Sequence, residues 1–219
     1  MNFIQLNENF DLKKHDFCGS ESKLYIVGND LYKLYNTNNV SSIYHLLCLT
    51  SKQRNLKGTV LPTGIILEND KLAGVQIPYF EEYKTLSSLT ELSNKTKISI
   101  IKLVLKNLEE LTNNEIYPMD FNIDGILVSG NDAKIVDLDT YTTEIANDSK
   151  KERLAFVLRL YLNIILELIY PDFILKPLSK KLEDYLVTKM LNQSIINDIC
   201  GKTISYSTLS NFIDSIKVK

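Results

Sequence analysis

The sequence predicts a two-lobed α+β fold, with a strand-rich first half followed by a helix-rich second half. Two hairpin patterns and one helix pattern fill the first half, and a long amphipathic helix pattern opens the second. We therefore expect a single domain made of an N-terminal lobe over residues 1–78, a hinge over 79–85 and a C-terminal lobe over 86–219. In such an arrangement a cleft is expected between the lobes.

The first half contains short runs of strand-forming residues that are joined by tight turns. Gly28–Asp30 and Glu68–Asp70 are typical of hairpin turns. Between the two hairpins, Asn39 can cap a helix over Val40–Gln53. The four predicted strands are Lys23–Val27, Leu31–Tyr35, Thr63–Leu67 and Leu72–Ile77.

The second half is dominated by helix patterns. One helix begins near Asn94, and Ser149–Glu152 is a capping box that opens a very apolar helix ending before Pro171. Polar residues recur at every fourth position of this apolar helix, which is also short for a bilayer span, so it is predicted to be a buried core helix. Further helices are expected over Pro177–Leu191, Ile195–Cys200 and Leu209–Ile216.

The composition bears on the binding partners and on the cellular compartment. The net charge of −2 offers no electrostatic case for binding nucleic acid or an anionic membrane. Three widely spaced cysteines without a C-x-x-C pair suit a reducing compartment, and the first residues lack the apolar run of a signal peptide. We therefore expect a cytoplasmic protein, or one delivered into another reducing compartment, without a membrane span.

One stretch, Ile116–Tyr141, holds five aspartates among strand-like segments. Gly125–Val128 and Ala133–Val136 flank a turn and predict a hairpin, with Asp120 before it and Asp137 at its end. Either aspartate alone is typical of a surface turn. Together they can supply a carboxylate that orients a hydroxyl and one that binds Mg²⁺, which is what phosphoryl transfer requires.

Two features of the first half could hold phosphate. An isolated strand lysine such as Lys33 usually faces solvent, and the functional alternative is a cation directed into the cleft. The segment Cys18–Lys23 combines one glycine with small hydroxyl residues, which can bring backbone N–H groups close to phosphates. With one glycine, an ordinary turn is the simpler interpretation.

Taken in order, the Gly/Ser turn, the strand lysine, the helix, the connector, the long helix, "IYPMDFNIDGILV" and "KIVDLD" resemble the protein-kinase-like fold, including its small bacterial and its sugar- or antibiotic-kinase relatives. The resemblance covers roughly residues 17–170. It implies a small β-rich N-lobe, a helical C-lobe, and ATP and Mg²⁺ as cofactors.

The resemblance also implies roles for individual residues. Asp120 matches the catalytic-loop aspartate, and Asp137 matches the metal-binding aspartate, with Asp139 and Asp124 as further candidate metal ligands. Asp139 could equally cap the following turn, and Asn122 is an alternative to Asp124. The residues expected to contact the nucleotide are Lys33 at the α/β-phosphates, Gly19, Ser20 and Ser22 in a reduced phosphate-covering loop, and Tyr79 and Phe80 beside the adenine.

The chain also departs from the family pattern. Pro118–Met119 replace the usual His-Arg, Gly125 stands where an asparagine is expected, and the helix after Lys33 contains no acidic partner for that lysine. Because Lys33, Asp120 and Asp137 are all present in the order of the family, the resemblance still implies an ATP-dependent phosphotransferase acting on a hydroxyl of a protein or small molecule. A pseudokinase that serves as a binding or regulatory module, and AMP transfer on the same fold, are the alternatives. The residues do not distinguish a protein acceptor from a small one.

Overall fold

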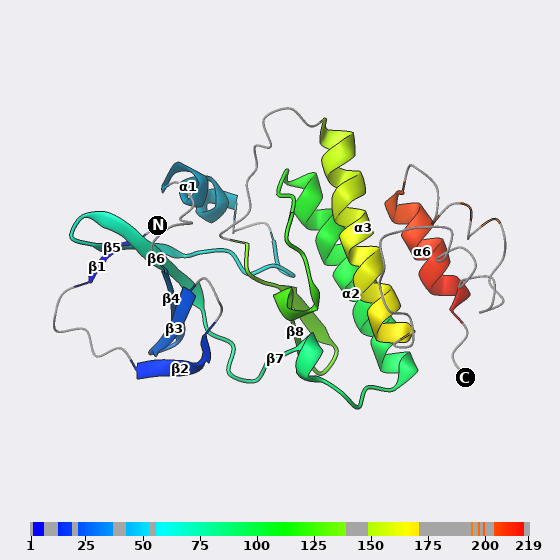
Figure 1. Cartoon of the computed structure of the whole chain (residues 1–219), viewed down its shortest axis with the longest axis horizontal. Helices are drawn as coiled ribbons and strands as arrows, with labels where there is room; N and C mark the ends of the chain where they lie inside the picture. The colour runs from blue at the N-terminus through cyan, green and yellow to red at the C-terminus, as the bar shows by residue number, and fades with distance from the viewer. Residues whose placement is uncertain are drawn as a thin grey trace.

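The computed structural model places a six-stranded sheet with one helix at one end of the molecule and a helical part at the other (Figure 1). A three-stranded sheet lies against the helical part. The structure describes residues 2–6, 13–18, 22–36, 43–52, 56–138, 149–170, 194, 197, 199 and 204–216. The α+β class and the strand-rich first half are confirmed.

The larger sheet has the strand order β1-β5-β6-β4-β3-β2. The hairpins β3–β4 and β5–β6 are the two predicted from the sequence, and Gly28 occupies the left-handed region in the first turn, with φ 63°. β1, which pairs parallel with β5, was not predicted. The strands are β1 Asn2–Leu6, β2 Lys13–Cys18, β3 Ser22–Val27, β4 Asp30–Tyr35, β5 Gly64–Glu68 and β6 Lys71–Pro78.

Helix α1, Ile43–Lys52, packs against β5 and buries Leu46 and Leu49 completely. The chain then crosses to the second lobe before it returns to the sheet. There Val60 N–H donates to the Ile135 carbonyl at 2.8 Å, and Ile135 N–H donates to the Gly58 carbonyl at 2.9 Å. Two backbone hydrogen bonds therefore join this N-terminal segment to the hairpin that carries Asp137.

The second lobe confirms the long helix and the aspartate-rich hairpin. Some boundaries differ from the prediction; among them, Lys84–Thr85, placed in the hinge, form strand β7, and Gly125, placed in a strand, ends a 3₁₀ turn. Both lie at element ends, which local patterns define poorly. The elements are β7, η2 Leu86–Ser88, α2 Asn94–Asn113, η3 Ile123–Gly125, β8 Ile126–Ser129, β9 Asp132–Ile135, α3 Lys150–Ile169 and α6 Tyr206–Ser215.

The apolar helix α3 lies in the core, as predicted. The Ser149–Glu152 capping box is formed in both directions, and Tyr161, which is fully buried, donates its hydroxyl to the Ile101 carbonyl of α2. Within the described residues no helix is both long and apolar enough to cross a membrane. The predicted cap at Asn39 and the predicted helix over Pro177–Leu191 lie outside the described residues.

Candidate functional site

Lys33 and Asp137 meet across the two lobes, although 104 residues separate them in the chain. The Lys33 ammonium forms an ion pair with Asp137 Oδ1. The lysine side chain is only 11% exposed, whereas that of Asp137 is 56% exposed. Lys33 therefore points between the lobes and not into open solvent, and its role toward phosphate stays a prediction.

The position of Lys33 follows from its place in the sheet. β4 is an interior strand, in which Lys33 lies opposite Leu24 on β3 and Val75 on β6. Next to Val75, Gly74 allows a close approach of the two strands: a Cβ at this position would lie 2.1 Å from the Lys33 carbonyl oxygen. The strand that carries the lysine is thus held tightly on both sides.

Asp137 lies two residues after the end of β9 and has an unusual backbone conformation. Its φ of 67° falls in the left-handed region, which aspartate tolerates better than most residues. On either side the chain is fixed, since Val136 N–H donates to the Gly125 carbonyl at 2.9 Å and Leu138 is buried. In this conformation the Asp137 carboxylate contacts Lys33.

Asp120 lies at the same end of the hairpin, before β8 begins, and its side chain is exposed. Asn122 stabilises the loop that joins Asp120 to β8. Its side-chain oxygen accepts from Asp124 N–H at 2.9 Å and Gly125 N–H at 3.2 Å, and its amide donates to the Asp120 carbonyl at 3.3 Å. Because β8 and β9 pair from Ile126 to Ile135, the loop before β8 and the turn after β9 are neighbours.

The candidate metal ligands are only partly brought together. The Asp124 carboxylate accepts a hydrogen bond from the Ser87 hydroxyl, which ties η3 to η2. Asp139 lies outside the described residues, and within those residues no three acidic, histidine or cysteine groups gather as a metal site. The half-exposed Asp137 carboxylate nevertheless fits a magnesium–nucleotide complex, because Mg²⁺ commonly uses one or two carboxylates together with water and substrate phosphates.

The predicted nucleotide-contacting residues occupy different surroundings. Ser22 begins β3 and is 4% exposed, and Gly19 and Ser20 lie outside the described residues. Tyr79 N–H donates to the Asn29 carbonyl at 3.0 Å, which attaches the hinge to the first hairpin turn. Phe80 packs edge-on against Tyr83, with ring centroids 5.3 Å apart. Their contacts with nucleotide stay predictions.

The sequence analysis missed a polar cluster that joins the hinge to the hairpin. The Tyr83 hydroxyl donates to Asp132 Oδ2 at 2.5 Å, and Lys134 pairs with Asp132 at 3.2 Å. The Lys134 ammonium also lies 5.3 Å from the Phe80 ring centroid and 5.4 Å from that of Tyr83. No local pattern links these residues, because they meet only when the hinge folds back on β9.

This cluster predicts a pH effect. Burial raises the pKa of the Asp132 carboxyl, but hydrogen bonds from Tyr83 and Lys134, the Lys134 charge and Ala133 N–H together lower it below the usual value. The hydrogen bond to Asp132 raises the pKa of Tyr83 to about 12. A lowered carboxyl pKa contributes stability above the unfolded-state pKa, and this contribution is lost as pH falls through the folded-state pKa.

We therefore expect Asp132→Asn to lower the free energy of unfolding at pH 6, and the difference from the unaltered chain to shrink toward pH 3. The Asp132 side chain is 50% exposed, so the effect should stay below about 1 kcal/mol. Urea unfolding at both pH values measures it, with the exposed Glu91→Gln as the control. A difference of the same size at both pH values would contradict the assignment.

Comparison with solved structures supports the fold. No protein-family model and no curated protein matches the chain. Among solved structures, the PAN3 pseudokinase of Neurospora crassa superposes with a TM-score of 0.66 at 11% identity, covering 97% of this chain and 63% of that one. The pseudokinase DRIK1, drought responsive inactive kinase 1, in a co-crystal with ENMD-2076, gives a TM-score of 0.57 at 14% identity, covering 93% and 84% of the two chains.

This chain thus spans less than two thirds of the PAN3 chain. At these identities the likeness concerns the fold alone. The chain has a divergent protein-kinase-like fold.

Proposed function

We propose that the chain binds Mg-ATP between β4 and the β8–β9 hairpin and transfers the γ-phosphate to a hydroxyl group of an acceptor. The observation that carries this proposal is the contact of Lys33 with Asp137 across the lobes. In the protein-kinase-like fold these two positions belong to the phosphate-binding lysine and the metal-binding aspartate. Their contact supports a triphosphate site, with its metal, beside these two side chains.

Each residue has a distinct task in this proposal. The Lys33 ammonium, held in a largely buried strand, would contact phosphate oxygens, and an Asp137 oxygen would hold the metal. Bound Mg²⁺ would supply charge neutralisation at the phosphates. The exposed carboxylate of Asp120 would orient the acceptor hydroxyl and accept its proton.

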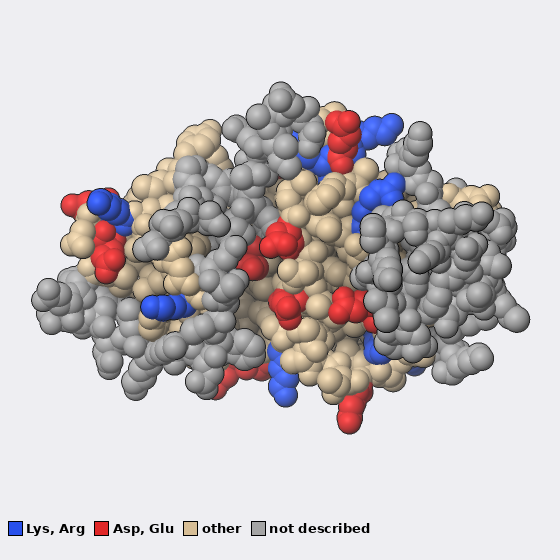
Figure 2. All heavy atoms as spheres, in the orientation of Figure 1, with Lys and Arg blue, Asp and Glu red and all other residues tan. Residues whose placement is uncertain are grey.

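The charge on the molecular surface supports a metal complex of the nucleotide. Asp120, Asp124 and Asp137 are all exposed. Figure 2 shows several acidic side chains near the middle of the visible face, with basic and further acidic side chains scattered around them. These exposed carboxylates disfavour a bare polyphosphate, so a metal-bound one is the better candidate ligand.

A second candidate function is that of a pseudokinase serving as a binding module. Its support is that α1 contains no acidic residue and that Asp137 itself is the ion-pair partner of the buried Lys33. A buried lysine paired in this way keeps its charge compensated without nucleotide. The names of both solved relatives describe pseudokinases, which agrees with this candidate.

The melting temperature with and without Mg-ATP distinguishes the two candidate functions. If Mg-ATP binds with a dissociation constant about a hundredfold below its concentration, the native state gains about 2.7 kcal/mol, which corresponds to roughly 5–10 °C for a chain of this size. The gain should disappear when a chelator removes the metal. No gain at millimolar Mg-ATP would exclude the phosphotransferase and favour the binding module.

The position of a radioactive label then identifies the reaction. We expect label from γ-labelled ATP, and none from α-labelled ATP, in the acceptor or in the chain itself. Label transferred from the α position would instead identify AMP transfer. A chain that gains stability with Mg-ATP and transfers neither label would be a nucleotide-binding pseudokinase.

A further inference from the structure

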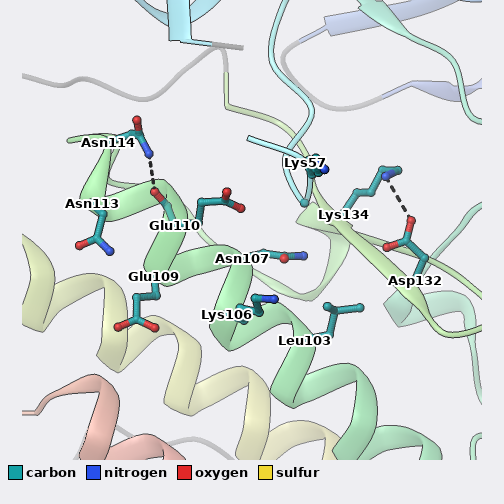
Figure 3. A pocket seen from close by; sticks show the side chains of 11 residues that line it. Lys57, Leu103, Lys106, Asn107, Glu109, Glu110, Asn113, Asn114, Asp132 and Lys134 are labelled. Atoms are coloured by element: carbon teal, nitrogen blue, oxygen red, sulfur yellow. Dashed lines mark hydrogen bonds and ion pairs between the residues drawn. The ribbon is translucent and has the colours of Figure 1, made fainter. Parts of the chain in front are cut away.

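A hollow lies between α2, β9 and the segment 57–58 (Figure 3). It is an open groove of about 630 Å³ and does not include Lys33, Asp120 or Asp137. Its charged lining residues are Lys106, Glu109 and Glu110 from α2, Lys57 from the segment, and Lys134 with its ion-pair partner Asp132 from β9; Leu103 and Asn107 of α2 lie among them.

The floor of the groove is firmly built. Asn107 is only 6% exposed and donates its amide to the Ala133 carbonyl of β9 at 2.8 Å. Gly58 packs directly on it, because a Cβ there would lie 2.1 Å from Asn107 Cγ. Gly58 is itself bonded to β9 through Ile135 N–H. Contacts among α2, β9 and the segment 57–58 thus fix the floor of the groove. Because the groove is already formed, less conformational entropy is lost when a ligand binds to it.

The groove walls carry charges of both signs in a definite order. Successive turns of α2 present apolar Leu103, cationic Lys106 and acidic Glu110, since residues three or four apart share a helix face. Lys57 and Lys134 lie on the wall opposite α2, and Glu110 lies toward Asn114 (Figure 3). The groove therefore has a positive part and a negative part.

Most of these charges lack an ion pair within the described part of the chain. Lys134 pairs with Asp132, whereas Lys57, Lys106 and Glu110 form none with any described residue. A ligand of one charge sign would leave one part of the groove unmatched or repelled. A ligand that carries both signs, in the complementary order, satisfies both parts.

We propose that this groove docks an extended peptide segment of a partner protein. An apolar side chain of the peptide lies on Leu103, an acidic one lies between Lys57 and Lys106, and a basic one faces Glu110. From Leu103 to Asn114 the helix rises about 16 Å, which an extended peptide covers with about five residues. The matched occupant is thus a short linear segment with both charges, not a folded surface.

The test uses the full chain and three fluorescent peptides of about seven residues. Each peptide contains a single leucine. In the first peptide a glutamate precedes a lysine, in the second the lysine precedes the glutamate, and in the third both positions are glutamine. Fluorescence anisotropy should show that one charge order binds and that the glutamine peptide binds about tenfold or more weakly. Raising the salt concentration should weaken the binding.

Variants of the groove locate the binding. Lys106→Glu and Glu110→Lys should each weaken the preferred peptide about tenfold, and the double variant should prefer the peptide with the charges exchanged. Lys95→Glu, on an exposed position of α2 outside the groove, is the matched control and should change nothing. Melting temperatures check that all variants are folded.

Several results would overturn the proposal. These are the absence of binding by every peptide at millimolar concentration, equal binding of all three peptides, and binding indifferent to both α2 substitutions. Self-association of the chain that Lys106→Glu abolishes would show that a second copy occupies the groove, and would equally reject a peptide ligand.

Discussion

Replacing Asp137 by asparagine is expected to abolish phosphate transfer, with a loss of at least about a hundredfold in rate. The amide keeps the shape of the side chain but cannot neutralise a metal ion. Asparagine also tolerates the left-handed backbone at this position, where φ is 67°, so the fold should persist. Transfer of γ-label and the melting temperature, measured on the same preparation, separate loss of chemistry from loss of structure.

The chain provides a matched control for this substitution. Asp70, in the β5–β6 turn, is also an exposed aspartate with a left-handed backbone, at φ 62°. Asp70→Asn should leave transfer and nucleotide-induced stabilisation unchanged. Undiminished transfer by Asp137→Asn, or an equal loss in both variants, would remove Asp137 from the proposed site.

The same substitution has a consequence for stability. Without the Asp137 carboxylate, the buried Lys33 ammonium loses an ion-pair partner, and since Asp137 is half exposed we expect a cost of only about 1 kcal/mol. Lys33→Met should largely relieve that cost when it is combined with Asp137→Asn. A double-mutant cycle by urea unfolding measures this coupling directly.

Local chemistry explains why much of this fold was predictable from the sequence. The turn at Gly28 and the capping box at Ser149 each depend on a few adjacent residues, and both formed as expected. The contact between Lys33 and Asp137 was predicted in another way, from the order of the elements along the chain. That order resembles a known fold, and the fold brings distant segments together.

The features that escaped prediction depend on long-range contacts without a local signal. β1 adds to the sheet by parallel pairing with β5, and no turn joins the two strands. The hydrogen bond between Ser87 and Asp124, and the contact of Tyr83 with Asp132, join residues whose side chains are individually ordinary surface groups. Because the bond from Ser87 engages the carboxylate of the candidate metal ligand Asp124, the ligand set at the site cannot be read from spacing alone.

Replacing Gly74 by alanine is expected to destabilise the N-terminal lobe strongly. An added Cβ would lie 2.1 Å from the Lys33 carbonyl oxygen and 3.0 Å from Leu34 Cα, and backbone atoms cannot rotate away. The strands must separate locally, which should cost about 2–3 kcal/mol and lower the melting temperature by roughly 5–10 °C. Because the displaced strand carries Lys33, the stabilisation by Mg-ATP should fall as well.

Gly125→Ala is the control for this prediction, since the nearest atoms to its added Cβ are 3.7 and 3.9 Å away, which is ordinary contact. It should change the free energy of unfolding by no more than about 0.5 kcal/mol. A Gly74→Ala chain that melts like the unaltered protein would show that β4 and β6 are not in such close contact. A Gly74→Ala chain that is destabilised but gains full stabilisation from Mg-ATP would show that the close packing of β4 does not position Lys33 for nucleotide binding.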